Sequence, residues 1–484
     1  MEKITKKIEI WQKMWYDIRK TVQKRRNPPK ERNCVMGKLF GTDGVRGVAN
    51  VELTCEMAFD LGRYGAYVLT KHLSHTPNIV VGRDTRVSGD MLEAALTAGI
   101  LSVGAHVTAA GIVPTPAVAH LVRKYGADAG VVISASHNTV EYNGIKFFNC
   151  DGFKLSDEIE DEIESYIFGQ QKIGELPYGD AVGMKTVADD AGEDYIKFAV
   201  DKAKCDFSGM TIALDCANGA AYHVAPAAIE RLGAAVHVIH NRPTGLNIND
   251  KCGSTHVEDL QKFVVDSGAD IGIAFDGDAD RLIAVDETGK VIDGDVIMGL
   301  CAMQLKEQGL LKDDTLVATV MSNLGLLLSC EKQGIKVLQA KVGDRYVLEE
   351  MQKNGYNLGG EQSGHIIFLE ENTTGDGLVS AIMLISMLKQ SGKTASALAS
   401  QITILPQILV NATIKNEHKN ALDNDVEVKA MIDMLDKKYD GCGRLLVRAS
   451  GTEPLVRVMI EGQDIEDMTS DAENLKNLLI SKFA

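Results

Sequence analysis

The chain has 484 residues, which is more than one ordinary domain contains and predicts about three or four domains. Hydrophobic residues make up 45% and charged residues 24%, as in globular proteins, and no apolar run approaches the roughly 20 residues that span a bilayer. The net charge of −16 argues against nucleic acid as a partner. Anionic substrates must then be bound locally, by arginine, lysine and backbone N–H groups.

Nine cysteines are scattered singly along the chain, and no two of them are spaced as CxxC. The odd count and the wide spacing argue against a disulfide framework and a zinc site, and they favour the reducing cytoplasm. The N-terminus carries charges throughout and has no uninterrupted apolar segment, so we do not expect a secretory signal.

Residues 1–35 form a basic extension with eleven Lys or Arg and only four acidic residues. Apolar side chains recur there at alternating spacings of four and three, which predicts one stripe on a helix: Ile4, Ile8, Trp11, Trp15, Ile18 and Val22. One interpretation is a cationic helix that lies on a membrane surface or on a partner. The alternative is that translation starts at Met36, so that the extension is absent from the native protein. The intact mass of the native protein distinguishes the two.

From Phe40 to about Ile404, short apolar runs alternate with Ala- and Leu-rich segments of helical length. This alternation predicts α/β domains with largely parallel sheets, whose ligands gather at the carboxyl ends of the strands. The strands that we expect are Ile79–Val81, Val103–Val107, Gly130–Ile133, Thr211–Asp215, Ala235–Ile239, Ile271–Phe275, Leu316–Val320 and Lys336–Gln339.

After about residue 405 the pattern changes to a smaller α+β unit, with expected strands Gln407–Ile414, Arg444–Val447 and Leu455–Ile460. Further changes of pattern lie near residues 190 and 295. The predicted domains are therefore 36–190, 191–295, 296–405 and 406–484, after the extension 1–35.

A first candidate site follows the expected strand Gly130–Ile133, where the chain continues to Ser136 and His137. Small residues let the backbone approach a phosphate, and Ser136 is a candidate nucleophile. His137 and Lys146 are candidates for activating it or for neutralising a phosphate. We expect the Asn-Gly pair at 143–144 to form a turn. The alternative interpretation of the whole stretch is a serine turn that caps a helix.

Three carboxylates follow the expected strand Ile271–Phe275 at alternate positions, namely Asp276, Asp278 and Asp280. Like charges this close repel, so a bound cation is the natural compensation, and all-oxygen ligands suit Mg²⁺. Arg281 beside them is a candidate for gripping a phosphate. A calcium EF-hand is the rival, but that loop needs glycine where Arg281 stands, and its flanks predict strands. A solvated acidic turn is the remaining alternative.

Two further loops carry clustered polar side chains. In the loop 359–365, Glu361 and His365 lie among glycines and are candidates for a general acid or base, although a lone histidine is more often structural. The second loop joins two expected strands of the C-terminal unit. Its arginines, hydroxyls and glycine predict an anion cradle, with a serine–threonine turn as the alternative: Arg448, Ser450, Gly451, Thr452 and Arg457.

These four stretches occur in the order found in the α-D-phosphohexomutase superfamily, which the chain resembles from Met36 to its end. The segments Phe40–Gly47 (FGTDGVRG) and Gly343–Arg345 (GDR) are similar to that superfamily too. One residue departs from the pattern, because Thr139 stands where the family usually has proline after Ser-His-Asn.

Within the superfamily, the chain most resembles the bacterial phosphoglucosamine mutase branch. Gln362 in the loop 359–365 carries this resemblance, because related phosphomannomutases usually have methionine there. The segments Gly245–Asn249 and Cys252–His256 fit the same branch.

The resemblance implies four domains around a central cleft, the first three α/β and the last a movable phosphate-binding lid. It implies an enzyme that interconverts glucosamine 6-phosphate and glucosamine 1-phosphate through phosphorylated Ser136 and a 1,6-bisphosphate intermediate. By motif match, Mg²⁺ would be held by the Ser136 phosphate and by Asp276, Asp278 and Asp280.

The resemblance also implies roles for the remaining candidates. Glu361 and Ser363 would contact sugar hydroxyls. The phosphate that is not transferred would be held by Arg448, Ser450, Gly451, Thr452 and Arg457. The candidates for proton transfer and charge stabilisation are Arg46, Lys146, Arg281 and His365. The resemblance further suggests a homodimer and a role in supplying UDP-N-acetylglucosamine for the cell wall.

Three other functions stay open at this point. The chain resembles phosphomannomutase/phosphoglucomutase almost as closely, and a panel of substrates separates the two. A phosphosugar-binding protein without catalysis would not turn over any of them. A phosphoserine-using phosphatase would release inorganic phosphate, whereas a mutase should not.

Overall fold

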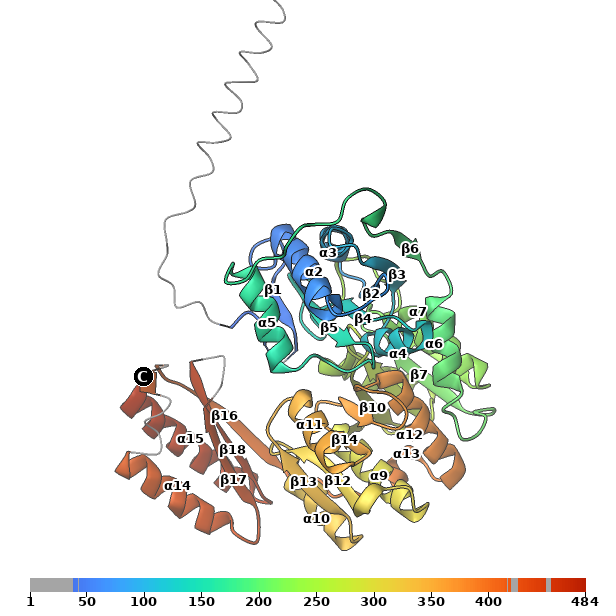
Figure 1. The fold of residues 1–484 in the computed structure, drawn as a ribbon. Helices are drawn as coiled ribbons and strands as arrows, with labels where there is room; N and C mark the ends of the chain where they lie inside the picture. Colours follow the sequence, from blue (N-terminus) through green and yellow to red (C-terminus); the bar gives the residue numbers. More distant parts are fainter. Residues whose placement is uncertain (1–37, 42, 416, 419–424, 450–453) are drawn as a thin grey trace, which may run out of the picture. The chain divides into compact units, whose positions relative to one another are not determined.

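The computed structural model describes residues 38–41, 43–415, 417–418, 425–449 and 454–484, and Figure 1 shows the fold. Residues from Phe40 onward form one compact unit. The predicted helix in residues 1–35 lies outside the described residues. Among the described residues, no helix is long and apolar enough to cross a membrane.

The first sheet has six strands, four of them parallel, with an antiparallel pair at one edge. In sheet order the strands are β1 (Val45–Val48), β5 (Tyr142–Asn149), β4 (Ala129–Ile133), β2 (Asn78–Arg83), β3 (His106–Ile112) and β6 (Lys185–Val187). The helices that accompany it are α2 (Cys55–Thr70), α3 (Ser88–Leu101), α4 (Thr115–Tyr125), α5 (Asp157–Ile167) and the short η1 (Gly179–Ala181).

Local sequence explains where these helices begin and end. The Thr54 hydroxyl accepts the Met57 N–H and so caps the first turn of α2. Helix α4 ends at Gly126, whose φ of 61° is a left-handed conformation that glycine adopts without strain. Strand β4 is buried along its whole length, as its run of apolar residues predicts.

The second sheet is built in the same way, with parallel strands at its centre and an antiparallel hairpin at one edge. In sheet order its strands are β11 (Val291–Ile292), β10 (Leu282–Asp286), β9 (Ile271–Phe275), β7 (Thr211–Asp215) and β8 (Ala235–Ile239). Its helices are α6 (Ala191–Val200), α7 (Ala221–Arg231), η2 (Gly253–Thr255) and α8 (Glu258–Ser267).

The third sheet has four strands, of which only the last pairs antiparallel. In order they are β13 (Lys336–Ala340), β12 (Thr315–Thr319), β14 (Leu358–Gly360) and β15 (Ile366–Phe368). Its helices are α9 (Gly294–Glu307), η3 (Lys312–Asp314), α10 (Leu324–Lys332), α11 (Asp344–Asn354), α12 (Gly377–Ser391) and α13 (Ala395–Ala399).

The C-terminal sheet, red in Figure 1, is antiparallel throughout and has the order β16-β18-β17. Its elements are β16 (Gln407–Thr413), α14 (Val426–Tyr439), β17 (Arg444–Ala449), β18 (Leu455–Glu461) and α15 (Ile465–Phe483). Three α/β sheets of mixed direction followed by an α+β unit confirm the predicted fold class.

The hydrophobic cluster of the C-terminal sheet is separate from the cluster that joins the first three sheets. One cluster of buried residues runs through the first three sheets and includes Val132, Ile273 and Leu316. The C-terminal sheet has a separate cluster, to which Val458 and Leu475 belong. The first three sheets therefore share a core, while the C-terminal unit is stabilised by its own.

Two local predictions were wrong. The strand expected at Val103–Val107 begins only at His106, because the chain first makes a turn at Gly104, with φ of 88°. The Asn-Gly pair at 143–144 lies inside strand β5 and forms no turn. Glycine is required at 144 for another reason, since a Cβ there would lie 2.4 Å from the Ser134 carbonyl oxygen.

Candidate active site

Ser136 and Asp276 meet at the ends of two buried strands from different sheets. Ser136 follows β4 and Asp276 follows β9. The Ser136 hydroxyl donates a hydrogen bond of 2.6 Å to Asp276 Oδ2. Both side chains are only 1% exposed. The structure therefore brings the predicted nucleophile to the predicted metal ligands at the carboxyl ends of the strands.

The three aspartates form a compact, buried group. Each offers an oxygen within 4.8 Å of the other two. Among the described residues, the buried oxygens Asp278 Oδ1 and Asp280 Oδ1 accept no hydrogen bond. Such oxygens are costly unless a cation binds them, and an all-carboxylate set fits Mg²⁺. Because the group joins the antiparallel strands β9 and β10 and not two helices, it is no EF-hand.

The pKa values of Asp276 and Asp280 are shifted in opposite directions. Burial raises the pKa of Asp276 well above its usual range, and the carboxylates of Asp280 and Asp278 raise it further. Burial also acts on Asp280, but Lys146 and His365 outweigh it and lower the pKa of that carboxyl. A divalent cation would favour the ionised form of all three carboxylates.

Lys146 reaches the group from β5 in the first sheet. Its Nζ lies 2.9 Å from Asp278 Oδ2, 3.0 Å from Asp43 Oδ2 and 3.5 Å from Asp280 Oδ2. Burial alone would lower the pKa of Lys146, but Asp278 and Asp43 raise it above the usual range. The side chain is therefore a fixed ammonium group beside the aspartates.

His137 and Arg281 lie on the other side of Ser136. His137 Nδ1 is 3.4 Å from Ser136 Oγ and 3.1 Å from Arg281 Nη1. Burial, together with the charges of Arg281 and Arg46, lowers the pKa of His137 to about 4. Arg46, on β1, forms an ion pair with Asp43. Arg281 and Arg46 thus bring positive charge close to His137, which contacts the Ser136 hydroxyl.

In the loop 359–365, His365 is buried near the aspartates, whereas Ser363 is exposed. His365 is 2% exposed, its Nε2 accepts the Gly375 N–H at 3.1 Å, and its Nδ1 lies 3.6 Å from Asp280 Oδ2. Glu361 Oε1 accepts the backbone N–H at the start of α11, and its charge contributes to raising the pKa of Arg281. Ser363 is exposed. The structure therefore brings His365 to the aspartates.

The predicted phosphate cradle lies on the C-terminal sheet, whereas the groups described so far come from the first three. Arg448 on β17 and Arg457 on β18 are direct partners in the antiparallel ladder. Like charges in such pairs are destabilising, and an anion bound by both would offset the repulsion. Ser450, Gly451 and Thr452 lie outside the described residues.

Sequence reasoning missed three charged residues that complete the site. Lys154 Nζ lies 2.6 Å from Asp43 Oδ1 and also pairs with Asp344, so these residues link the first sheet to the third. Asp43 and Asp344 lie in the FGTDGVRG and GDR segments, whose acidic residues were a usable signal. Lys154 belongs to no recognisable motif, so only the fold shows that it lies at the site.

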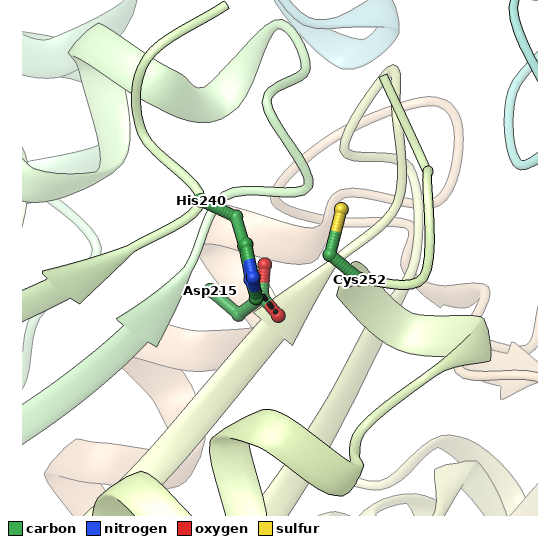
Figure 2. A group of neighbouring side chains, drawn as sticks. All are labelled: Asp215, His240 and Cys252. Atoms are coloured by element: carbon green, nitrogen blue, oxygen red, sulfur yellow. Dashed lines mark hydrogen bonds and ion pairs between the residues drawn. The ribbon is translucent and has the colours of Figure 1, made fainter. Parts of the chain in front are cut away.

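A second group of neighbouring ligand-type residues lies elsewhere and comprises Asp215, His240 and Cys252, which Figure 2 shows. Asp215 accepts N–H groups from His240 Nδ1 at 2.9 Å, from Gly253 at 2.9 Å and from Ala217 at 2.8 Å. Burial raises the pKa of the Cys252 thiol to about 12. Because Asp215 already accepts three N–H groups and burial keeps the Cys252 thiol protonated, we interpret this group as an anchor for the segment 240–253.

Comparison with known proteins identifies the family. Models of the phosphoglucomutase/phosphomannomutase domains match the chain in four consecutive parts. Domain I matches residues 37–173, domain II 193–289, domain III 293–404 and the C-terminal domain 409–477. The chain belongs to the phosphoglucomutase/phosphomannomutase family.

Within the phosphoglucomutase/phosphomannomutase family, curated relatives match nearly the whole chain. The phosphoglucosamine mutase of Clostridium novyi is 58% identical over 447 residues, which cover 92% of this chain and 99% of that protein. The phosphoglucosamine mutase of Clostridium acetobutylicum is also 58% identical, over 92% of this chain and all of that protein (100%). The resemblance found in the sequence motifs is therefore confirmed.

Solved structures of more distant members have the same fold. A phosphoglucomutase/phosphomannomutase family protein from Burkholderia thailandensis superimposes with a TM-score of 0.76 at 23% identity, covering 93% of this chain and 98% of that one. N-acetylphosphoglucosamine mutase of Aspergillus fumigatus, solved with GlcNAc-6P and magnesium, gives 0.68 at 17% identity, covering 96% and 99%.

Proposed function

We propose that the chain is a phosphoglucosamine mutase that interconverts glucosamine 6-phosphate and glucosamine 1-phosphate through phosphorylated Ser136. The observation that carries this proposal is the hydrogen bond of 2.6 Å between Ser136 Oγ and Asp276, inside a buried group of three carboxylates. The identity of 58% to curated phosphoglucosamine mutases supports the choice of substrate.

The metal in this proposal is one Mg²⁺ ion. Asp276, Asp278 and Asp280, with an oxygen of the Ser136 phosphate, would hold it. The two carboxylate oxygens without hydrogen-bond partners among the described residues support this assignment. When bound, the ion would neutralise charge that develops on the transferring phosphoryl group.

The reaction has two balanced half-reactions. In the first, the bond from phosphorus to Ser136 Oγ breaks, a bond from phosphorus to O1 of glucosamine 6-phosphate forms, and the proton of the O1 hydroxyl ends on Ser136 Oγ. In the second, the bisphosphate has reoriented, the bond from phosphorus to O6 breaks, a bond from phosphorus to Ser136 Oγ forms, and the serine proton ends on O6. Glucosamine 1-phosphate leaves, and no phosphate is lost.

The other predicted residues take the roles that their motifs imply. His137 contacts the nucleophile itself. Glu361 and Ser363 would contact sugar hydroxyls, with Gln362 beside them. Candidates for proton transfer and charge stabilisation are Arg46, Lys146, Arg281 and His365. The phosphate that is not transferred would be held by Arg448, Ser450, Gly451, Thr452 and Arg457.

A hexose 1,6-bisphosphate would serve as activator, because it can phosphorylate Ser136 from either end. We place the enzyme in the cytoplasm, where its product would enter the synthesis of UDP-N-acetylglucosamine and cell wall. We also propose a homodimer, on the family resemblance. Because the chain is acidic, we do not expect it to bind nucleic acid.

The deciding experiment measures conversion of glucosamine 6-phosphate with Mg²⁺ and a catalytic amount of glucose 1,6-bisphosphate. Glucose and mannose phosphates are assayed in parallel. Preference for glucosamine supports the proposal, and EDTA should abolish turnover until Mg²⁺ is restored. Preference for glucose or mannose would retain the phosphoserine chemistry but contradict the substrate. Steady release of inorganic phosphate would indicate a phosphatase, and no turnover at all a binding protein.

A further inference from the structure

Ser136 has a backbone conformation that serine rarely adopts. Its φ is 52°, in the left-handed region, and it is one of few residues other than glycine with a positive φ in the part of the chain that the structure describes. Such strain persists only where the surroundings over-determine it, and it commonly marks functional sites. The contacts that impose it should therefore be identifiable.

The first of these contacts comes from Arg86, the largest of the fully buried side chains. Its Nη2 donates to the Ser136 carbonyl at 3.0 Å and to the Asn138 carbonyl at 2.7 Å, and its Nη1 donates to the Thr139 carbonyl. One guanidinium group thus holds three carbonyls of the nucleophile loop. Its planar fork of donors suits this task, and a lysine could not reproduce it.

Asp84 compensates the buried charge of Arg86. Its Oδ2 accepts Arg86 Nε at 2.9 Å and the Ser134 hydroxyl at 2.6 Å. The Ser134 oxygen in turn accepts the Ser136 backbone N–H at 3.0 Å. The N–H and the carbonyl of Ser136 are therefore both fixed by one connected network.

The second contact comes from Asn249, which lies in the loop between β8 of the second sheet and η2. Its Nδ2 donates to the Ser136 carbonyl at 2.8 Å and to the Asn138 carbonyl at 2.9 Å. Gly277 makes this approach possible, because a Cβ at 277 would lie 2.6 Å from the Ser136 carbonyl oxygen and 2.7 Å from Asn249 Nδ2. The segment that carries Asn249 is anchored by Asp215 (Figure 2).

We propose that Arg86 and Asn249 are positioning residues that hold Ser136 in its strained conformation and so aim Oγ at the metal-binding aspartates. This inference rests on the proposed phosphoserine function. Arg86 is fully buried and paired with Asp84, and the Asn249 amide donates to the Ser136 and Asn138 carbonyls. Without these donors, the Ser136 and Asn138 carbonyls would be buried and unpaired, and the loop would relax toward negative φ.

The test compares Asn249→Ala and Arg86→Lys with Asn247→Ala. Asn247 lies two residues away and stabilises the same segment, through Thr244 at 2.8 Å and the Arg242 carbonyl at 3.1 Å, without touching the nucleophile loop. We expect kcat to fall about 100-fold in both clamp variants, because misplacing a reacting group by about 1 Å has that effect. KM should stay within about twofold, and Asn247→Ala should retain nearly the wild-type kcat.

A second readout measures phosphorylation of Ser136 directly. Each protein is treated with glucose 1,6-bisphosphate, and the phosphorylated fraction is followed by intact mass over time. Slow phosphorylation in clamp variants that still unfold cooperatively on heating supports the proposal. Wild-type rates in Asn249→Ala, or equal losses in Asn247→Ala, would overturn it.

These outcomes separate the inference from the proposed function. If the wild-type protein is phosphorylated but does not convert glucosamine 6-phosphate, the substrate assignment fails and the clamp is still judged by the phosphorylation rates. If Ser136 of the wild-type protein is never phosphorylated, both proposals are overturned. A variant that fails to fold is replaced by Asn249→Ser, judged by the same two measurements.

Discussion

At the scale of single residues, the sequence predicted the reacting groups better than their supports. Ser136 and the three aspartates could be identified because their chemistry requires those residue types after buried strands. Lys154, Arg86 and Asn249 could not, because a lysine, an arginine or an asparagine has many ordinary roles and only spatial contacts distinguish them. Lys154 and Asp344 lie 190 positions apart in the chain.

The role of Ser136 gives the first prediction. Ser136→Ala should reduce turnover to the limit of detection, because no other oxygen can carry the phosphoryl group in the two half-reactions. The fold should remain, since alanine is smaller and the hydroxyl contacts that are lost, to Asp276 and His137, lie within the site. Turnover assays and circular dichroism check both parts. Retained turnover would contradict the phosphoserine mechanism.

His240 gives a prediction about pH. The hydrogen bond to Asp215 raises the pKa of His240 above its value in the unfolded chain, about 6.5, with Asp259 adding to the rise and burial opposing it. Its ionisation therefore contributes stability that is fully present below about pH 6.5 and is lost as pH rises through the raised folded value.

The matched variant is His240→Asn, because asparagine tolerates the left-handed φ of 47° at this position and still donates a hydrogen bond. Urea unfolding is measured from pH 5.5 to 9 in both proteins. We expect the stability advantage of the wild-type protein to shrink as pH rises. An advantage that does not change with pH would contradict the assignment.

At the scale of elements, the apolar runs located strands well. Strands β7, β8 and β9 coincide with their predicted ranges, because continuous apolar segments between polar turns have few other solutions. Short edge strands such as β6 and β11 were missed, since exposed strands carry no such run. The turn predicted at the Asn-Gly pair in β5 was wrong, because glycine also occurs where close packing leaves no room for a Cβ.

Close packing of α2 against α3 gives the element-scale prediction. A Cβ at Gly99 would lie 2.1 Å from the Phe59 carbonyl oxygen, so Gly99→Ala must push the two helices apart. We expect the free energy of unfolding to fall by about 3 kcal/mol. Gly126→Ala is the control, because a Cβ there meets nothing within 4 Å and only its φ of 61° is strained. It should cost about 1 kcal/mol, and equal losses in chemical denaturation would contradict the packing argument.

At the scale of the whole molecule, the contacts between sheets could not be predicted from the sequence. One example is Glu461 at the end of β18, which is fully buried. Its carboxylate accepts Arg444 Nε at 3.0 Å and the N–H of Leu324, at the start of α10, also at 3.0 Å. Arg444 also donates to the Ser322 carbonyl at 2.8 Å. This pair joins the C-terminal sheet to the third sheet.

Removing one partner of this pair should be costly. Glu461→Ala leaves Arg444 without its carboxylate, and we expect the free energy of unfolding to fall by about 3 kcal/mol. Glu473→Ala removes a carboxylate that pairs with Lys476 on the surface, and it should change stability by less than about 0.5 kcal/mol. The free energy of unfolding of both variants is measured by urea denaturation, which is followed by far-UV circular dichroism. Similar values for the two variants would argue against a structural link through Glu461.

The separate core of the C-terminal unit has a consequence for how such enzymes can diverge. Val458 and Leu475 pack only with residues of that unit, so its interior can change without disturbing the strands that carry Ser136 and the aspartates. Few side chains, among them Glu461 and Arg444, must stay matched across the junction. The C-terminal unit could therefore be exchanged between relatives as a whole, with the residues that carry the phosphoryl-transfer chemistry unchanged.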